Sequence, residues 1–262
     1  MTQALQALIL GIVEGATEFV PVSSTGHLII AADWLGYPEA ERATFEIFIQ
    51  MGAILAVFWH YRSDLLQLAQ RAQRERPAQE LIGKVLLAFL PAAAVGFLLH
   101  RWIEAHLFSV RAVAGALIVG GIVIWLVERR PRPATVQRME AMGWREALWV
   151  GLAQVTSLYP GVSRAAATII GGMLAGMSRP AATHFSFYLA LPTLTAASLF
   201  SLAKALPTIT AGEASSLTIG FVSAFVTALL VIRAFLRYVQ SHDFRPFAYY
   251  RIALGVLLLL YL

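Results

Sequence analysis

The chain has 262 residues, of which 58% are hydrophobic and 13% are charged, and its formal net charge is +5 at pH 7. Soluble domains carry roughly 25% charged residues, so this composition excludes an ordinary soluble protein and indicates an integral membrane protein. The absence of cysteine excludes a disulfide framework and thiolate chemistry. The basic residues fall between apolar runs, which favours membrane orientation over binding to nucleic acid.

The first apolar segment, residues 4–35, is too long for one membrane span and is interrupted at Pro21 and Gly26. Proline disrupts a helix, and each remaining piece is shorter than the ~20 residues that a span needs. We therefore predict a re-entrant helix–loop–helix that enters and leaves on the same side of the membrane. A single kinked span is the alternative interpretation.

Two carboxylates lie in the first part of this segment. Glu14 and Glu18 are four residues apart, so they share one helix face. Buried ionisable groups in a membrane are costly and usually functional. The pair can transfer a proton or hold a divalent cation together with substrate phosphates. A purely structural pair, satisfied by the backbone or by Arg164, is the alternative.

Hydroxyls and an imidazole follow the first break. Ser23, Ser24 and Thr25 precede a helix predicted to begin near Gly26, whose free N–H groups would form an anion site. Simple helix capping is the alternative role for each hydroxyl. His27 is a candidate to deprotonate a serine or to protonate a leaving oxygen.

Further apolar runs, 47–59, 85–99 and 113–127, predict three transmembrane helices after the first re-entrant pair. Residues 128–144 are predicted to be a cytoplasmic linker. The second half then begins with another broken segment, 145–176, and continues with three more predicted spans.

The second break, at Pro160 and Gly161, brings an arginine into an apolar setting. Ser163 is a candidate helix cap, and the planar fork of Arg164 suits phosphate oxygens. Thr168 lies one turn further along the same face. A plain ion pair between Arg164 and Glu18 is the alternative.

The chain matches itself at an offset of 140 residues without a gap. Among the matched pairs are Gly11 with Gly151, Glu14 with Gln154, Ser23 with Ser163, and Arg111 with Arg251. Chance matching between apolar helices is the alternative. One re-entrant pair and three spans make an odd number of crossings, so the second half would be inverted. The predicted fold is all-α and integral to the membrane, with inverted repeats over 1–127 and 145–262.

Most basic residues, Arg251 among them, fall in the segments 62–84, 128–146, 177–182 and 236–251. In this topology these four segments are non-spanning and lie on one side. The positive-inside rule makes that side cytoplasmic and puts both termini on the periplasmic side.

The motif from Glu14 to His27 and the motif Pro160-Gly161-Val162-Ser163-Arg164 with Thr168 resemble the undecaprenyl-pyrophosphate phosphatases of the bacitracin-resistance type. The resemblance covers essentially the whole chain. It implies removal of the terminal phosphate from undecaprenyl pyrophosphate, a divalent cation (Mg²⁺ or Ca²⁺), a bacterial inner-membrane location and a periplasmic active site. The family motif usually continues Ser-Arg with Ser-Gly, whereas Ala165 and Ala166 stand here.

Carried onto this sequence, the resemblance implies Ser24 as nucleophile and His27, Glu18 and Glu14 as further catalytic residues, with Glu14 and Glu18 as metal ligands. The predicted pyrophosphate-binding residues are Ser163, Arg164, Thr168, Ser23, Thr25 and Gly161. His27 and Glu18 are alternative bases, and direct attack by water or by His27 stays open. A lipid-phosphate transporter with the same anion cradle is the rival function. Homodimer formation is left open by the sequence.

Overall fold

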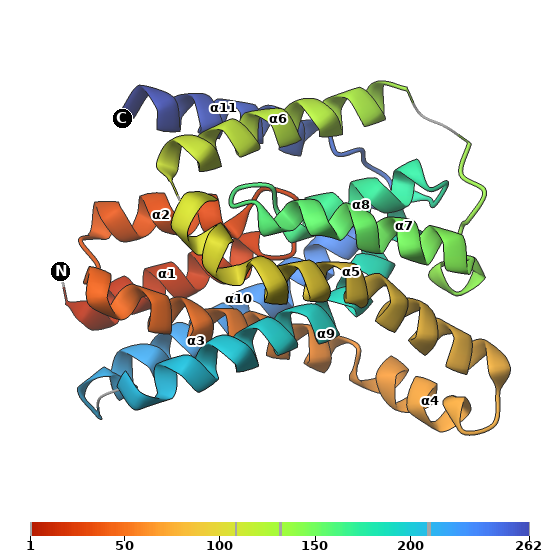
Figure 1. Ribbon diagram of the computed structural model, residues 1–262, viewed down its shortest axis with the longest axis horizontal. Helices are drawn as coiled ribbons and strands as arrows, with labels where there is room; N and C mark the ends of the chain where they lie inside the picture. Colours follow the sequence, from red (N-terminus) through yellow and green to blue (C-terminus); the bar gives the residue numbers. More distant parts are fainter. Residues whose placement is uncertain (1, 108, 131–132, 209–210, 262) are drawn as a thin grey trace.

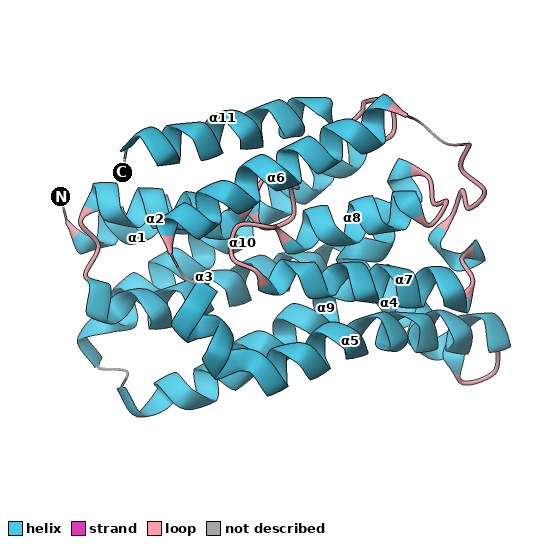
Figure 2. Cartoon of the chain, turned by 45° about the horizontal axis from the view of Figure 1, so that its top comes forward, coloured by secondary structure: helices cyan, strands magenta, loops and turns pink. Residues whose placement is uncertain are grey.

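The computed structural model describes residues 2–107, 109–130, 133–208 and 211–261. Predicted boundaries at residues 1 and 262, and linker residues 131 and 132, lie outside this part of the chain. Helices occupy most of it and no strand is formed within it (Figures 1 and 2). The helices are α1 (Gln3–Thr17), α2 (Ser24–Leu35), α3 (Glu39–His60), α4 (Arg62–Ala72), α5 (Arg76–Leu107), α6 (Val110–Arg129), η1 (Met139–Ala141), α7 (Trp144–Val155), η2 (Thr156–Leu158), α8 (Arg164–Leu174), α9 (Arg179–Ala205), η3 (Leu206–Thr208), η4 (Ala211–Glu213), α10 (Ala214–Tyr238) and α11 (Arg245–Tyr261).

The chain is an all-α integral membrane protein. Five helices of the described residues are long and apolar enough to cross a membrane, namely α3, the 76–103 part of α5, α6, α9 and α10. The sixth predicted span corresponds to α11, which has 17 residues. By contrast, α1, α2, α7 and α8 have only 15, 12, 12 and 11 residues, so each is short for a span.

Both predicted breaks are present. The first separates α1 from α2 and the second separates α7 from α8. The helix after the first break begins at Ser24, two residues earlier than the predicted start at Gly26, because Ser23 is its capping residue. Helices from the two halves pack side by side, α1 with α10, α7 with α5, α3 with α9 and α6 with α11. The start of α1 and the end of α11 lie at one end of the molecule, and α4 lies at the other (Figure 1).

Glycines let the broken helices approach their neighbours closely. A Cβ on Gly15 of α1 would lie 2.5 Å from the carbonyl oxygen of Ala224 and 2.8 Å from the amide nitrogen of Ala228, both on α10. On α7, a Cβ on Gly151 would lie 2.6 Å from the carbonyl oxygen of Ala88 on α5. Small residues allow such backbone contact between membrane helices. Here Gly15 brings α1, which carries Glu14, close to α10, and Gly151 brings α7 close to α5.

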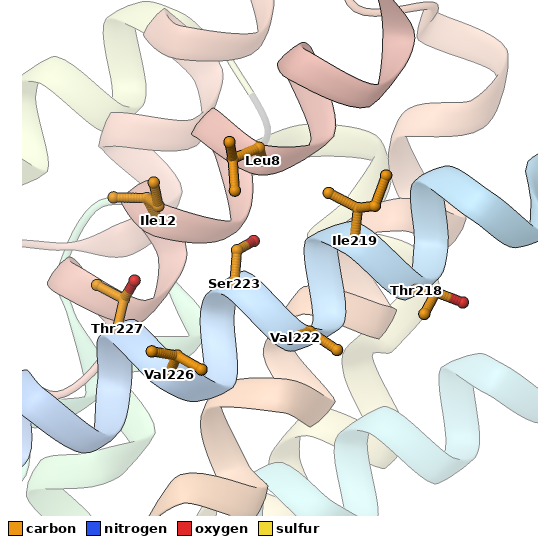
Figure 3. A pocket seen from close by; sticks show the side chains of 8 residues that line it. All are labelled: Leu8, Ile12, Thr218, Ile219, Val222, Ser223, Val226 and Thr227. Atoms are coloured by element: carbon orange, nitrogen blue, oxygen red, sulfur yellow. The ribbon is translucent and has the colours of Figure 1, made fainter.

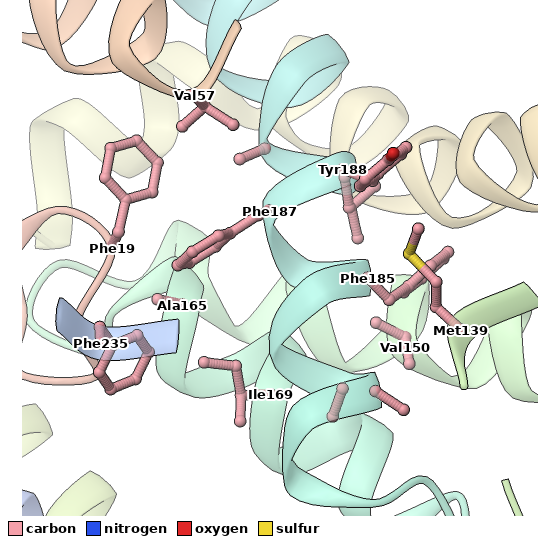
Figure 4. Packing of buried hydrophobic residues seen from close by; sticks show 14 of the residues in the cluster. Phe19, Val57, Met139, Val150, Ala165, Ile169, Phe185, Phe187, Tyr188 and Phe235 are labelled. Carbon is pink, nitrogen blue, oxygen red and sulfur yellow. The ribbon is translucent and has the colours of Figure 1, made fainter. Parts of the chain in front are cut away.

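The main apolar core surrounds α9 and reaches the first break (Figure 4). Phe19, in the turn after α1, meets Phe187 of α9 edge to face with ring centroids 5.5 Å apart. The core therefore packs directly against the first break.

On the outer surface, an apolar groove of about 500 Å³ runs between α1 and α10 (Figure 3). None of the predicted site residues lines this groove, so the groove is separate from the candidate site.

Two sequence expectations about basic segments were wrong. The segment 62–84 was predicted not to span the membrane, but its residues 76–84 belong to the 76–103 part of α5, which is long and apolar enough to do so. Arg251 does not lie in a loop but is fully buried in α11. Pro246 stands in the first turn of that helix, where a proline is tolerated, so α11 begins six residues before Arg251. Arg251 therefore gives no information about membrane orientation.

Candidate functional site

The two breaks end in matching serine turns. Ser23 and Ser163 both have φ of 73°, and they are the non-glycine residues of the described chain with positive φ. Ser23 Oγ accepts a hydrogen bond from the Gly26 amide at 3.4 Å, and Ser163 Oγ accepts one from the Ala166 amide at 3.2 Å. Each serine thus caps a helix whose first N–H groups have no partner within the helix, as an anion site requires.

Glu18 joins the two breaks. Its Oε2 accepts a hydrogen bond from Ser24 Oγ at 2.6 Å, and its Oε1 accepts one from Arg164 Nη2 at 3.0 Å. The Glu18 and Arg164 side chains are only 7% and 8% exposed. The ion pair that the sequence left as an alternative is therefore present, and it holds the Ser24 hydroxyl in the same cluster.

Arg164 has further polar neighbours on α9. Its Nη1 donates to the carbonyl oxygen of Ser186 at 3.3 Å and to Ser186 Oγ at 3.4 Å. Thr168 Oγ1 donates to the Arg164 carbonyl at 2.9 Å and lies 2.6 Å from Ser186 Oγ. Arg164 Nε is buried without a hydrogen-bond partner, a costly arrangement that leaves a donor for an anion. Ser186 was not predicted as a site residue, although it occupies the position of Glu46 at the 140-residue offset.

Glu14 lies one helical turn before Glu18 and is 2% exposed. Its carboxylate forms no hydrogen bond or ion pair with the residues that the structure describes. No group of three or more acidic, histidine or cysteine side chains suited to a metal occurs among them either. Mg²⁺ commonly takes one or two carboxylates together with waters and substrate phosphates. Glu14, with Glu18 beside it, fits that mode better than an all-protein calcium cage.

Both ring nitrogens of His27 have hydrogen-bond partners other than Ser24. Its Nδ1 lies 2.7 Å from the carbonyl oxygen of Ser23, and its Nε2 lies 2.6 Å from the Tyr250 hydroxyl. A carbonyl only accepts, so Nδ1 carries a proton and Nε2 of the neutral ring accepts from Tyr250. The two rings also stack, with centroids 5.5 Å apart. Tyr250 was not predicted, because it precedes an apolar run with no local motif.

The remaining predicted residues lie at the same two turns. Thr25 is half-buried in the first turn of α2. Gly161 has φ of 93°, and a Cβ there would lie 2.7 Å from the Val113 carbonyl oxygen, so a side chain does not fit. Its own carbonyl oxygen accepts a hydrogen bond from Arg251, which, like Ser186 and Tyr250, the sequence analysis did not predict as a site residue. The turns therefore carry acid, hydroxyl and guanidinium groups beside two helix N-termini.

Comparison with known proteins shows the family of this chain. The sequence model of the family described as "Bacitracin resistance protein BacA" matches residues 7–257. An undecaprenyl-diphosphatase of Methylococcus capsulatus is 49% identical over 97% of this chain and 93% of its own length. Proteins of the same name from Nitrosospira multiformis and Thermoanaerobacter pseudethanolicus are 48% and 45% identical, over 98% and 99% of this chain and 94% and 97% of their own lengths. The chain therefore belongs to the BacA family of bacitracin resistance proteins.

Proposed function

We propose that this protein hydrolyses undecaprenyl pyrophosphate to undecaprenyl phosphate and inorganic phosphate. The observation that carries the proposal is the cluster of half-buried Ser24 with the buried side chains of Glu18 and Arg164, beside two helix N-termini. The name undecaprenyl-diphosphatase, shared by relatives that match nearly the whole chain, supports the lipid substrate. The product, undecaprenyl phosphate, would be reused in the synthesis of peptidoglycan and other envelope polymers. The hydrolysis would also confer bacitracin resistance.

In this proposal Ser24 Oγ attacks the terminal phosphorus. Glu18 takes the hydroxyl proton, since its Oε2 is already 2.6 Å from Ser24 Oγ and thus within reach for general base catalysis. The oxygen–phosphorus bond to the lipid phosphate breaks as the serine–phosphorus bond forms. Water then cleaves the phosphoserine and restores the Ser24 hydroxyl. His27 is the less supported base, because both of its ring nitrogens have other partners.

Arg164 and the helix ends supply the electrostatic part. The entering pyrophosphate would displace the Arg164 fork from Glu18, freeing that carboxylate to act as base and moving the guanidinium onto phosphate oxygens. Backbone N–H groups at the starts of α2 and α8 would bind the remaining oxygens. Ser23, Thr25, Gly161, Ser163 and Thr168 would shape this cradle. A divalent cation held by Glu14, with Glu18 beside it, would neutralise further phosphate charge.

The proposed topology is a pair of inverted repeats, each with one re-entrant pair and three spans. Three features support it: apart from α4, the same order of short and long α-helices in both halves, the reciprocal packing of α1 with α10 and α7 with α5, and the matching serine φ angles. We further propose a bacterial inner-membrane location, with both termini and the active site on the periplasmic side.

Phosphate release from undecaprenyl pyrophosphate by the purified protein in detergent tests the function. Glu18→Gln and Ser24→Ala should each lower the rate by about 10²-fold or more, because base and nucleophile are lost. Arg164→Ala should lower both rate and substrate affinity, and a chelator should abolish activity that Mg²⁺ restores. Glu75→Gln, an exposed acid paired with Arg71, is the matched control and should leave the rate unchanged.

An inactive wild-type protein under varied divalent metals would contradict the proposal, as would full activity of Ser24→Ala and Glu18→Gln. Either result would make lipid-phosphate transport the leading function, because a carrier needs the anion cradle but not a nucleophile. Activity that survives Ser24→Ala but not Glu18→Gln would instead favour direct attack by water.

A further inference from the structure

Arg251 of α11 lies behind the site, and its guanidinium bonds only to backbone. It is fully buried. The five N–H groups of its fork all donate to carbonyl oxygens, those of Leu117 (3.4 Å), Pro21 (3.3 Å), Val162 (2.9 Å), Ala116 (3.2 Å) and Gly161 (3.0 Å). A guanidinium has five such donors, so its hydrogen-bonding capacity is used completely.

These carbonyls belong to three separate segments. Pro21 lies in the first break, Gly161 and Val162 lie in the second, and the other two belong to α6. The acceptors in the breaks stand one or two residues before Ser23 and Ser163, which have the positive φ angles. Such backbone persists only where its surroundings over-determine it. Arg251 is a side chain that ties both turns to each other and to α6.

Its charge is not neutralised by a neighbouring acid. No carboxylate is among its hydrogen-bond acceptors, and it takes part in no salt bridge within the described residues. A buried cation beside two helix N-termini adds to the positive potential that favours a phosphate anion there. Arg251 thus differs from Arg164, whose charge is paired with Glu18.

We infer that Arg251 is a positioning residue for the phosphate site. It sets the distance between the turn that carries Ser24 and the turn that carries Arg164, and it holds both at the geometry of the reaction. This inference rests on the proposed function, because it assigns Arg251 to the same site. It acts through the two turns and does not touch the substrate.

Gly120 of α6 offers an independent way to disturb Arg251. A Cβ on Gly120 would lie 2.2 Å from Arg251 Nη2 and 2.8 Å from its Cζ, so alanine would push the guanidinium aside. This substitution changes neither turn directly and keeps the charge. Arg111 is the matched control, because it stands 140 residues before Arg251 but is exposed at the start of α6.

The experiment compares Arg251→Lys, Arg251→Gln, Gly120→Ala and Arg111→Lys. It measures kcat and KM for undecaprenyl pyrophosphate. It also measures Kd and stoichiometry for a polyprenyl methylenediphosphonate, whose bridging CH₂ resists hydrolysis. The stoichiometry gives the folded fraction of each preparation, so a lower rate per folded molecule cannot come from misfolding.

Arg251→Lys and Gly120→Ala should lower kcat by about 10²-fold, because a displacement of about 1 Å at the reacting groups costs that much. Their KM and Kd should stay within about threefold of wild type, because the charge is kept. Arg251→Gln should lower kcat and also weaken analogue binding about tenfold, because the charge is lost. Arg111→Lys should match wild type throughout.

The inference is overturned if Arg251→Lys and Gly120→Ala keep kcat within about threefold of wild type. It is also overturned if their lower rates are fully explained by a lower stoichiometry of analogue binding. A wild-type protein that binds the analogue but releases no phosphate would contradict the proposed function instead. In that case weaker analogue binding by Arg251→Gln, but not by Arg111→Lys, would still support the role of Arg251.

Discussion

At the scale of single residues, the central contact of the site is an ion pair between an acidic and a basic side chain. Glu18 and Arg164 come from different halves of the chain and form a buried ion pair at 3.0 Å. A pair of this kind rarely adds stability over apolar residues of similar volume, but removal of one partner leaves an uncompensated buried charge. The pair is therefore better explained by function than by stability.

This argument predicts opposite effects of single and double substitutions on stability. Arg164→Met alone should destabilise the protein by about 3–5 kcal/mol, because Glu18 is left buried without its partner. Adding Glu18→Met should recover most of that loss, although neither variant should release phosphate. Thermal unfolding in one detergent measures both changes. A double variant less stable than Arg164→Met would show that the pair is a net source of stability.

Tyr250 provides a second test at this scale, because it decides between two candidate bases. Tyr250→Phe removes the hydroxyl next to His27 Nε2 but keeps an aromatic ring for stacking. If Glu18 is the base, the rate should fall less than about tenfold, since one hydrogen bond of about 1 kcal/mol is lost outside the reaction path. A loss as large as that of Ser24→Ala would instead identify His27 as the base. The measurement is kcat for both variants.

At the scale of elements, the short helices depend on their long neighbours for position. The α1 helix has 15 residues and ends directly before Glu18, so its placement against α10 determines where that carboxylate lies. Gly15 permits the close contact, because the two atoms of α10 nearest to an added Cβ belong to the backbone of Ala224 and Ala228, and Thr227 Cβ follows at 2.9 Å. Helix backbones move little without disturbing their own hydrogen bonds, so added volume there has no easy outlet.

We therefore expect Gly15→Ala to destabilise the protein by about 1–3 kcal/mol and to lower the rate of phosphate release. Gly115→Ala is the matched control, because a Cβ at Gly115 of α6 meets no atom within 4 Å. The control should be stabilised by about 0.5–1 kcal/mol, as expected for alanine in place of a helical glycine. Thermal unfolding of both variants checks the signs. Equal effects would mean that the α1–α10 contact is not tight.

The sequence predicted the elements well and the side-chain contacts only in part. Pro21 and Pro160 marked both breaks, because proline leaves a clear local signal. The direction of His27 was not predictable, since it depends on Tyr250, 223 residues away. Arg251 was misassigned to a loop because a charged residue directly before an apolar run resembles the polar flank of a span. Only the packing of α11 against α6 reveals that it is buried.

At the scale of the whole molecule, the arrangement of helix ends leads to a test of topology. The start of α3 and the start of α10 follow connections that the inverted-repeat topology assigns to the periplasmic side. The turn after α4 and the turn after α10 belong to the cytoplasmic side. The chain has no cysteine, so each connection can be labelled through a single introduced thiol without background.

Ala40→Cys and Ser215→Cys, both at exposed positions near the periplasmic helix starts, should react with a membrane-impermeant maleimide in intact spheroplasts. Gln73→Cys and Ser241→Cys, exposed at the opposite connections, should react only after the membrane is permeabilised. The reason is that basic residues near spans are retained on the cytoplasmic side, and Arg71, Arg74 and Arg237 flank those connections. Mass-shift electrophoresis of the labelled protein reads out all four sites. Reaction of Ala40→Cys and Ser215→Cys on opposite sides would rule out an inverted second half, because the two positions would then be separated by the bilayer.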